Sequence, residues 1–449
     1  MQNKEQGGKG RTTTISVRSL TTGAVLPADL HDPNGILLLK SGSTVTKRFI
    51  HAILARGIET VEIEQAAAQS MQQGVAKPTD PYEIVPTDQI VPAGEVVTAR
   101  TIQLDQAIET EQLPDPTIPS HDGAATRLPD LKSLREETVE AAECRRTTVQ
   151  IYGNIVDEVK DGNPIDVSGV TEVVSRMQTC VMKDTRLASL LMDFGASEGG
   201  YILKHGLNVA WLATASATWM GMEPKLVRQV GLAAMFQDIG MLRVPESIRF
   251  AQRPLTADER ALIDHHPIHS LELLTRSGEI DQIGLMVAYQ SHERCNRSGY
   301  PRKRHRMFIH PMARMTAVAD VYAAVTCPRP YRDPLIPYRG MTTLLDEVKA
   351  GRLDNDFVRM FLDCFGLFPV GSYVRLSEGT TARVICANGR HHTKPVVVPV
   401  AADGTEAPEQ IDLFNCEDVS VAAALSESEA CRKIGGDKAE DPEGADQAA

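Results

Sequence analysis

The feature that most constrains the fold is a long stretch of helical hydrophobic periodicity in the middle of the chain. From residue 131 to about residue 360, apolar residues recur at helical spacing. Short polar segments of the kind that end helices interrupt the stretch at residues 161–164, 195–200 and 221–224. A chain with this pattern is expected to fold mainly as an α-helical bundle.

The segments on either side have different patterns. Residues 13–65 combine short apolar runs, one helical period and the turn Asp32-Pro33-Asn34-Gly35, which predicts a small α+β N-terminal module. Residues 366–421 alternate around turn residues such as Gly379 and predict a short β C-terminal extension. The expected fold class is therefore mainly α, with a small module at each end of the helical domain.

Two segments lack sustained periodicity. Residues 66–130 are rich in Pro, Asp, Glu, Gln and Thr, which predicts a flexible linker. Residues 422–449 are acidic and poor in aromatic residues, which predicts a disordered tail. The helical stretch itself divides at residue 195 into a lead-in, residues 131–194, and a main domain, residues 195–365.

Composition argues against several classes of function. The formal net charge of the 449 residues is -12, which disfavours nucleic-acid binding because neutralising phosphates requires a basic surface. The first ten residues are polar, and no segment approaches about 18 uninterrupted apolar residues, so we expect neither export nor membrane association. The eight cysteines form no Cys-x-x-Cys pair, which favours reduced thiols and a cytoplasmic location.

Histidine and aspartate residues recur along the helical domain at nearly constant spacing. Intervals of 26 to 33 residues separate His205, Asp238, His266, His292 and Asp320. This spacing places one donor on each helix of a bundle, an arrangement that builds dinuclear metal centres able to act on phosphodiesters. Such donors suit iron, manganese or zinc. Taken singly, each residue is more commonly capped, paired or exposed, so the surrounding motifs must decide.

Four ordered motifs surround these residues. They are Gln237-Asp238-Ile239-Gly240-Met241 with Val244-Pro245 and Ile248; His266-Pro267 with Ser270; Ser291-His292-Glu293-Arg294 with Asn296-Arg297-Ser298-Gly299-Tyr300-Pro301; and residues 319–326 with Arg329-Pro330-Tyr331-Arg332. In this order, over residues 192–350, they resemble the HD-GYP family, the bacterial cyclic di-GMP phosphodiesterases among the HD-domain phosphohydrolases.

The resemblance implies an HD-type helical bundle. It makes the five His and Asp residues metal ligands, with Asp238 in the catalytic role of bridging metals or directing hydroxide. It makes Arg329 and Arg332 phosphate contacts of cyclic di-GMP; for Arg332 the alternative is an ion pair with Asp333. Tyr300 would shape the substrate pocket, and the Gly299-Tyr300-Pro301 loop would dock a diguanylate cyclase or another protein.

The sequence departs from the family pattern at positions that carry chemistry. Gln237 replaces a ligand histidine, Ser291 replaces the first of two adjacent ligand histidines, and Met241 replaces a lysine expected to contact phosphate. Tyr201 stands where some members supply a bridging glutamate. Losing even an outer ligand partner typically costs about 10- to 100-fold in metal affinity or activity, so we expect one divalent metal or none. Arg243 could replace the lost cation, although a two-residue step on a helix points elsewhere.

Three functional hypotheses follow. The first is a regulatory or scaffold protein of cyclic di-GMP signalling that binds a nucleotide or a partner and hydrolyses slowly or not at all. The second is an active phosphodiesterase with an altered metal centre. The third is an HD-type fold that acts on another phosphoester or serves only protein contacts. The basic run at residues 302–306 fits either an anion site or a solvated loop.

Overall fold

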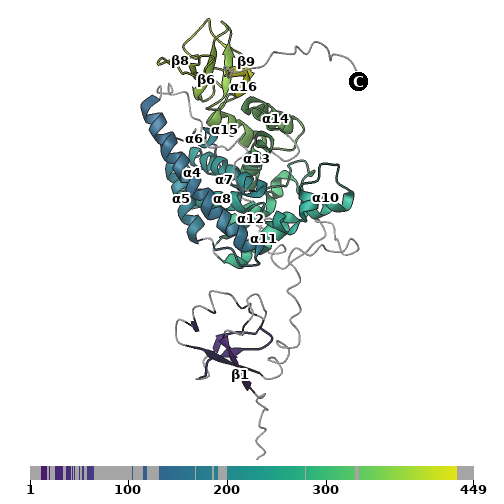
Figure 1. The fold of residues 1–449 in the computed structure, drawn as a ribbon. Coiled ribbons are helices and arrows are strands. Elements are labelled where there is room, and N and C mark those ends of the chain that lie inside the picture. Colours follow the sequence, from purple (N-terminus) through teal and green to yellow (C-terminus); the bar gives the residue numbers. More distant parts are fainter. Residues whose placement is uncertain are drawn as a thin grey trace, which may run out of the picture.

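Three folded parts follow one another along the chain: a small N-terminal sheet, a large helical domain and a C-terminal sheet (Figure 1). The computed structural model describes residues 12–17, 20, 26–33, 37–41, 43, 45, 50, 53–54, 58–64, 104, 115–118, 131–166, 168–184, 187–190, 200–278, 280–328 and 333–431. Helices dominate the central domain and small sheets flank it, which confirms the expected fold class.

The N-terminal sheet has four strands in the order β1-β4-β2-β3. Its strands are β1 (Thr12–Ser16), β2 (Leu30–His31), β3 (Leu37–Leu39) and β4 (Thr60–Glu64). Strands β1 and β4 pair antiparallel, with Ile15 opposite Val61. Alternation along β4 buries Val61 and Ile63 against Leu26 and Leu30, which gives this sheet a small core of its own.

The helical domain contains the site. Its α-helices are α4 (Leu131–Lys160), α5 (Ser168–Lys183), α6 (Leu187–Leu190), α7 (Tyr201–Trp219), α8 (Pro224–Phe236), α9 (Glu246–Arg249), α10 (Ala257–Asp264), α11 (His266–Ser277), α12 (Gln282–Gln290), α13 (Pro311–Thr326), α14 (Pro337–Lys349) and α15 (Asn355–Phe365). Two 3₁₀ helices, η3 (Ile239–Arg243) and η4 (Arg306–Phe308), connect them. None of the described helices is both long and apolar enough to cross a bilayer.

Helix α7 runs through the middle of this domain, and nearly all its residues between Ile202 and Ala217 are buried. A helix that is apolar on every side must be packed on every side. Helix α8 crosses α7 closely because Gly206 has no side chain: a Cβ atom there would collide with the carbonyl oxygen of Met235. Tyr152 of α4 donates a hydrogen bond to the same carbonyl at 2.6 Å. This close crossing brings the residue beside Gly206, His205, next to the end of α8.

The C-terminal sheet has five antiparallel strands in the order β8-β7-β6-β5-β9. They are β5 (Tyr373–Leu376), β6 (Thr381–Cys386), β7 (Val396–Pro399), β8 (Ile411–Asp412) and β9 (Val421–Leu425), and a short helix, α16 (Glu427–Ala430), follows. Strand β9 pairs with β5, with Leu425 opposite Tyr373.

The predicted disordered tail at residues 422–449 is therefore wrong as far as residue 431. The acidic residues after β9 form a capping box: Ser426 accepts from the backbone N–H of Glu429, and the Glu429 carboxylate accepts from the backbone N–H of Ser426 at 2.7 Å. Acidic side chains at a helix start are stabilising, so acidity here marks a helix N-terminus rather than disorder. Residues 432–449 lie outside the described residues.

The described parts of residues 66–130 contact the helical domain. Leu104 is 1% exposed and Ile118 packs against the same core. The Asp115 carboxylate forms an ion pair with Arg306 at 2.8 Å and another with Arg314. These positions are held in place, contrary to the expectation of a flexible linker; the rest of the segment lies outside the described residues.

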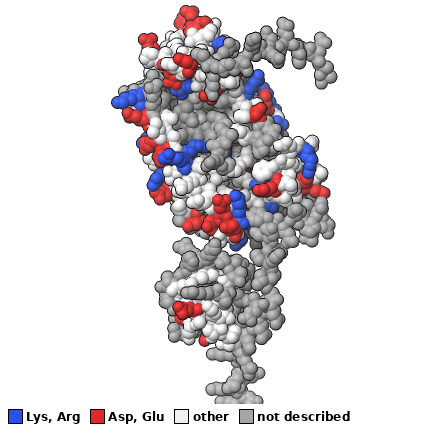
Figure 2. Space-filling model, viewed as in Figure 1, with Lys and Arg blue, Asp and Glu red and all other residues white. Residues whose placement is uncertain are grey.

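Charged side chains of both signs are mixed over the face shown in Figure 2. The described residues of that face form no extended basic surface, as expected for a chain with a net charge of -12.

Candidate metal centre

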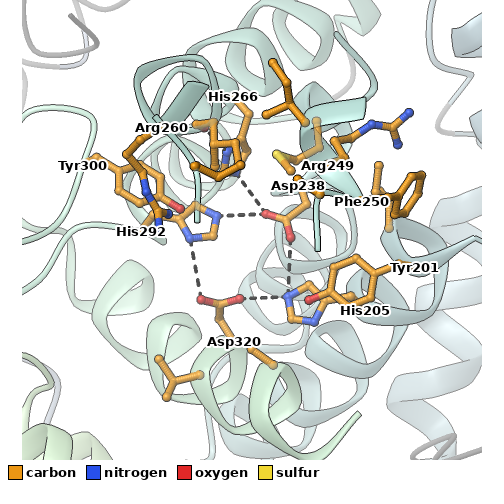
Figure 3. A pocket seen from close by; sticks show the side chains of 18 of the residues that line it. Tyr201, His205, Asp238, Arg249, Phe250, Arg260, His266, His292, Tyr300 and Asp320 are labelled. Atoms are coloured by element: carbon orange, nitrogen blue, oxygen red, sulfur yellow. Dashed lines mark hydrogen bonds and ion pairs between the residues drawn. The ribbon is translucent and has the colours of Figure 1, made fainter. Parts of the chain in front are cut away.

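Five buried side chains from separate segments meet at one end of a cavity in the helical domain (Figure 3). They are the five predicted ligands: His205 in α7, Asp238 between α8 and η3, His266 at the start of α11, His292 just after α12, and Asp320 in α13. Each is between 2% and 8% exposed. The chain thus brings together residues spread over more than one hundred positions of sequence.

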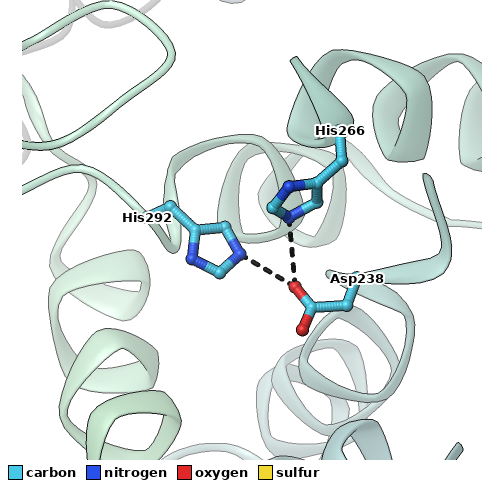
Figure 4. Close-up of side chains that lie close together, drawn as sticks. All are labelled: Asp238, His266 and His292. Carbon is cyan, nitrogen blue, oxygen red and sulfur yellow. Dashed lines mark hydrogen bonds and ion pairs between the residues drawn. The ribbon is translucent and has the colours of Figure 1, made fainter. Parts of the chain in front are cut away.

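Asp238 lies at the middle of the cluster. Its Oδ1 is 2.9 Å from His292 Nε2 and 3.2 Å from His266 Nε2 (Figure 4), and its Oδ2 is 3.4 Å from His205 Nε2. Asp320 lies opposite, with Oδ1 2.9 Å from His205 Nε2 and Oδ2 3.6 Å from His292 Nδ1. Asp238 is therefore shared by two groups of three donors.

These two groups are Asp238 with His266 and His292, and Asp238 with His205 and Asp320. In each group, one donor atom from every member lies within 4.8 Å of the others. We name them the His266 group and the His205 group. A carboxylate shared by two such groups is the arrangement from which a two-metal site is built.

Local backbone geometry explains how Asp238 reaches this position. Helix α8 ends at Phe236, and the chain tightens into η3 directly after Asp238. Gly240 lets η3 lie against the first turn of α11, since a Cβ atom at this position would collide with the carbonyl oxygen of His266. The Ser270 hydroxyl donates to the carbonyl of Gln237 at 2.6 Å and accepts from the Gly240 N–H at 2.9 Å. Ser270, the small residue of the second motif, therefore joins α11 to the segment that carries Asp238.

The electrostatics of the cluster favour added positive charge. Burial raises the pKa of Asp238, but hydrogen bonds from His266 and His292 outweigh it and hold this pKa well below its usual range. Burial likewise opposes ionisation of Asp320, yet the charge of His292 and the hydrogen bond from His205 lower its pKa. Both carboxylates are thus anionic near neutral pH.

The pKa values of His266 and His292 shift in opposite directions. Burial lowers the pKa of His266, and its contacts with Asp238 do not offset this effect. For His292 burial also lowers the pKa, but the charge of Asp320 and the hydrogen bond and charge of Asp238 outweigh it, so the pKa is raised. The two buried carboxylates therefore favour positive charge beside them, which suits a divalent cation.

The geometry of His266 also fits a metal ligand. Its Nδ1 lies 2.7 Å from the carbonyl oxygen of Ile263, which makes Nδ1 the N–H donor and leaves a lone pair on Nε2. In the protonated ring Nε2 donates to Asp238 Oδ1 at 3.2 Å, and in the neutral ring, which the lowered pKa of His266 favours, this nitrogen is able to bind a cation instead. Imidazoles oriented by a backbone carbonyl are typical of metal sites. The donors present therefore fit a divalent ion such as iron, manganese or zinc.

The three positions that depart from the family pattern, Gln237, Ser291 and Met241, supply no imidazole or cation to the centre. Gln237 is fully buried, and its Nε2 donates to Asp320 Oδ1 at 3.1 Å. The Ser291 hydroxyl donates to the carbonyl of Ala288 at 3.3 Å, within its own helix end. Met241 places an apolar side chain in the cavity wall. The centre thus has one amide where an imidazole was expected, and Ser291 is turned away to its helix.

Arg243 does not replace the missing lysine. Its guanidinium pairs with Glu272 at 2.5 Å and lies 3.1 Å from His269 Nδ1, on the side of η3 that faces α11. It does not line the cavity. Arg243 thus points away from the cavity, as its two-residue step from Met241 predicts.

The cavity above the centre has a volume of about 660 Å³, within the range of ligand pockets. Its wall holds four arginines and three aromatic residues: Arg249, Arg253, Arg260, Arg294, Tyr201, Phe250 and Tyr300. None of these arginines is among the predicted site residues, although Arg294 lies within the third motif. The predicted phosphate contacts Arg329 and Arg332 lie outside the described residues.

Two of the aromatic residues lie directly against the donors. The Tyr300 ring stacks on His292 with ring centroids 5.1 Å apart, and the Tyr201 ring stacks on His205 at 5.3 Å. The loop that carries Tyr300 is held by the buried Glu293, whose carboxylate accepts the backbone N–H groups of Arg302 and Arg304 at 2.6 and 2.8 Å. With the loop held in this way, Tyr300 lines the cavity.

The basic run that follows the loop does not face this cavity. Arg302 donates to the Tyr289 hydroxyl at 2.8 Å, and Arg306 pairs with Asp354 at 2.8 Å. No residue from 302 to 306 lines the cavity. The alternative of an anion site on this run gains no support from its position.

Comparison with known proteins agrees with the motifs. Residues 183–357 match the HD domain family. The chain is 29% identical over 266 residues to "Cyclic di-GMP phosphodiesterase PA4108" of Pseudomonas aeruginosa, a match that covers 59% of this chain and 63% of that protein. It is 34% identical over 132 residues to "Cyclic di-GMP phosphodiesterase" of Thermotoga maritima, covering 29% of this chain and 36% of that protein.

Residues 183–357 carry an HD domain, and the relatives that match it are named cyclic di-GMP phosphodiesterases, so this domain is of the HD-GYP type. This HD-GYP chain is also 29% identical over 172 residues to "3'3'-cGAMP-specific phosphodiesterase 1" of Vibrio cholerae, covering 38% of this chain and 39% of that protein. The matches thus span 63% or less of the length of these three relatives. Metal dependence is a property of HD-domain phosphohydrolases, and the two donor groups are the residues that could hold metal here.

Proposed function

We propose that this HD-GYP chain binds a cyclic dinucleotide, cyclic di-GMP in the first instance, and hydrolyses it slowly or not at all. The observation that carries the proposal is a full-sized cavity above a centre that lacks two ligand histidines, at Gln237 and Ser291. The names of the Pseudomonas and Vibrio relatives support cyclic dinucleotides as the ligand class. Such a protein would regulate by binding, as a sensor or scaffold in cyclic di-GMP signalling.

The two donor groups differ in what they offer a metal. In the His266 group, Asp238 meets only imidazoles. In the His205 group, Asp320 Oδ1 already accepts the Gln237 amide while it contacts His205. That N–H competes with a cation for the same oxygen, so the His266 group would hold metal more tightly. We therefore propose one strongly bound ion.

A bound divalent metal would supply an activated water and stabilise developing negative charge on phosphate. The residues of the chain itself would orient the ligand and exclude solvent. Met241 offers no charge to a phosphate. Arg294 lies 3.7 Å from Asp320 Oδ2, so part of its charge is already neutralised. Both features favour binding over fast turnover.

A second candidate function is phosphodiesterase activity with an altered centre. The shared Asp238 favours it, because all five retained donors still converge into two groups. Catalysis would then use Asp238 as the residue that joins both metals. The third possibility, another phosphoester or protein contacts alone, would show no response to cyclic dinucleotides.

The decisive experiment measures metal content, cyclic di-GMP binding and turnover on one preparation purified without chelators. We expect about one metal per chain, saturable binding and negligible turnover with added manganese or ferrous iron. The double variant Gln237→His/Ser291→His should then gain a second metal and at least about 100-fold in turnover, the upper range for one restored ligand partner. Gln282→His, at an exposed position of α12, is the matched control and should gain neither.

Two metals per chain with turnover by the unaltered protein would overturn the proposal and establish the second function. A folded protein that responds to no cyclic dinucleotide would leave only the third.

We also propose that the Gly299-Tyr300-Pro301 loop contacts a protein partner such as a diguanylate cyclase. Residues 296–298, directly before this loop, are exposed, so Arg297→Glu should weaken that contact in a two-component binding assay.

A further inference from the structure

Phe250 is an exposed aromatic residue in the cavity wall. Its side chain is 38% exposed, which is unusual for a ring of this size next to a buried cluster. Among the described residues, the other large exposed apolar side chains do not line this cavity; they are Val139, Met182, Met307, Leu335 and Phe414. Exposed apolar surface inside a pocket commonly marks a ligand contact.

The position of this ring is fixed by its neighbours. Phe250 follows α9, and its backbone N–H bonds to the carbonyl of Glu246 at 2.9 Å. The guanidinium carbon of Arg249 lies 5.2 Å from the ring centroid, and Arg249 is itself held by the carbonyl of Val244 at 2.9 Å. The exposed part of the ring thus lies beside an anchored guanidinium in the cavity wall.

Aromatic residues lie on both sides of the buried carboxylates. Figure 3 shows Phe250 and Tyr201 on one side of Asp238, and Tyr300 and Arg260 on the other. Arg260 is exposed, and within the described part of the chain no hydrogen bond or ion pair joins its guanidinium to another side chain. A ligand that fits this cavity should therefore have flat rings at two ends and negative charge between or beside them.

We infer that Phe250 is the stacking platform for one purine base of a cyclic dinucleotide, with Arg260 available to a phosphate. This inference rests on the proposed function and assigns a residue to base recognition. Aromatic rings accept any base on their π-face, so Phe250 would add affinity without selecting one purine over another. The cation lost at Met241 would be replaced from the cavity wall, by Arg260, rather than from η3.

The test is calorimetric titration of cyclic di-GMP into the full chain and its variants. Phe250→Ala and Phe250→Leu should each raise the dissociation constant by about 10-fold or more, the range expected for removing one stacked base. Phe250→Trp should bind at least as well as the unaltered protein, because it keeps the π-face. Phe414→Ala is the matched control, since Phe414 is 43% exposed on the C-terminal part and should not affect binding.

Metal content should be equal in all four variants, because Phe250 touches none of the five donors in the contacts described above. Equal affinity of Phe250→Leu and the unaltered protein would overturn the inference and leave the proposed function intact. No binding of any cyclic dinucleotide by the unaltered protein would overturn both. If Phe250→Ala fails to fold, the Leu and Trp variants, which keep most of the side-chain volume, decide the outcome.

Discussion

Replacing Ser270 with alanine should loosen the metal centre without touching a ligand. Ser270 is fully buried in α11, and its hydroxyl bonds both the carbonyl of Gln237 and the N–H of Gly240. These two backbone groups flank Asp238. Ser270→Ala would leave both without the partner that now satisfies them.

The magnitude follows from that loss. A buried donor or acceptor left unsatisfied costs about 1–3 kcal/mol, so two such groups should lower the free energy of unfolding by about 2–6 kcal/mol. Part of this cost would be relieved if η3 shifts away from α11, and that shift would carry Asp238 away from His266. Lower stability and weaker metal binding are thus expected together.

Urea unfolding at neutral pH measures the first effect, and competitive titration with a chelator measures the second. Ser277→Ala is the matched control in the same helix: its hydroxyl makes a single bond, to the carbonyl of Leu274 at 2.7 Å, and should cost about 1 kcal/mol or less. A change below about 0.5 kcal/mol for Ser270→Ala would refute the argument. So would a large loss of stability with unchanged metal affinity.

Two other predictions follow from the charges of the domain. Asp354→Asn keeps the cap of α15 but removes the charge that pairs with the buried Arg314. In urea unfolding it should lower the free energy of unfolding by about 3 kcal/mol. The control Asp346→Asn, whose partner Lys349 is exposed, should cost less than about 1 kcal/mol. Because the pKa of Asp238 is lower in the folded protein, its stabilising contribution is present above the unfolded pKa of about 3.9 and is lost as pH falls through the folded value. The melting temperature of chelator-treated protein should therefore drop steeply below about pH 4, and Asp238→Asn should flatten that dependence.

Much of this fold could be predicted from local pattern. The helices of the central domain follow from apolar periodicity, since a buried helix needs apolar residues at helical spacing. The convergence of His205, Asp238, His266, His292 and Asp320 follows from ordered motifs. The roles of the small residues in these motifs are visible only in the structure. Gly240 permits the close contact between η3 and α11, and Ser270 holds it by hydrogen bonds.

Other features depend on contacts that no local pattern encodes. Arg249, Arg260 and Phe250 come to the cavity because of how the segment between η3 and α11 folds back over the site, and nothing in their spacing signals it. The docking of Asp115 depends on Arg306 and Arg314, almost two hundred residues away. Sparse contacts of this kind leave no periodicity, so a docked segment and a free linker look alike in sequence.

Under the proposed function, hydrolysis and dinucleotide binding depend on different residues of the cavity. In-line displacement with two metals needs both donor groups, and Gln237 weakens only the His205 group, by placing an N–H on Asp320 Oδ1. Stacking on Phe250 and charge from Arg260 use neither Gln237 nor Asp320. A mutation at residue 237 therefore changes the rate of chemistry far more than the affinity for a dinucleotide. Binding without turnover is the expected phenotype of such a change, and a histidine at this position should raise turnover while leaving the dissociation constant within a few-fold.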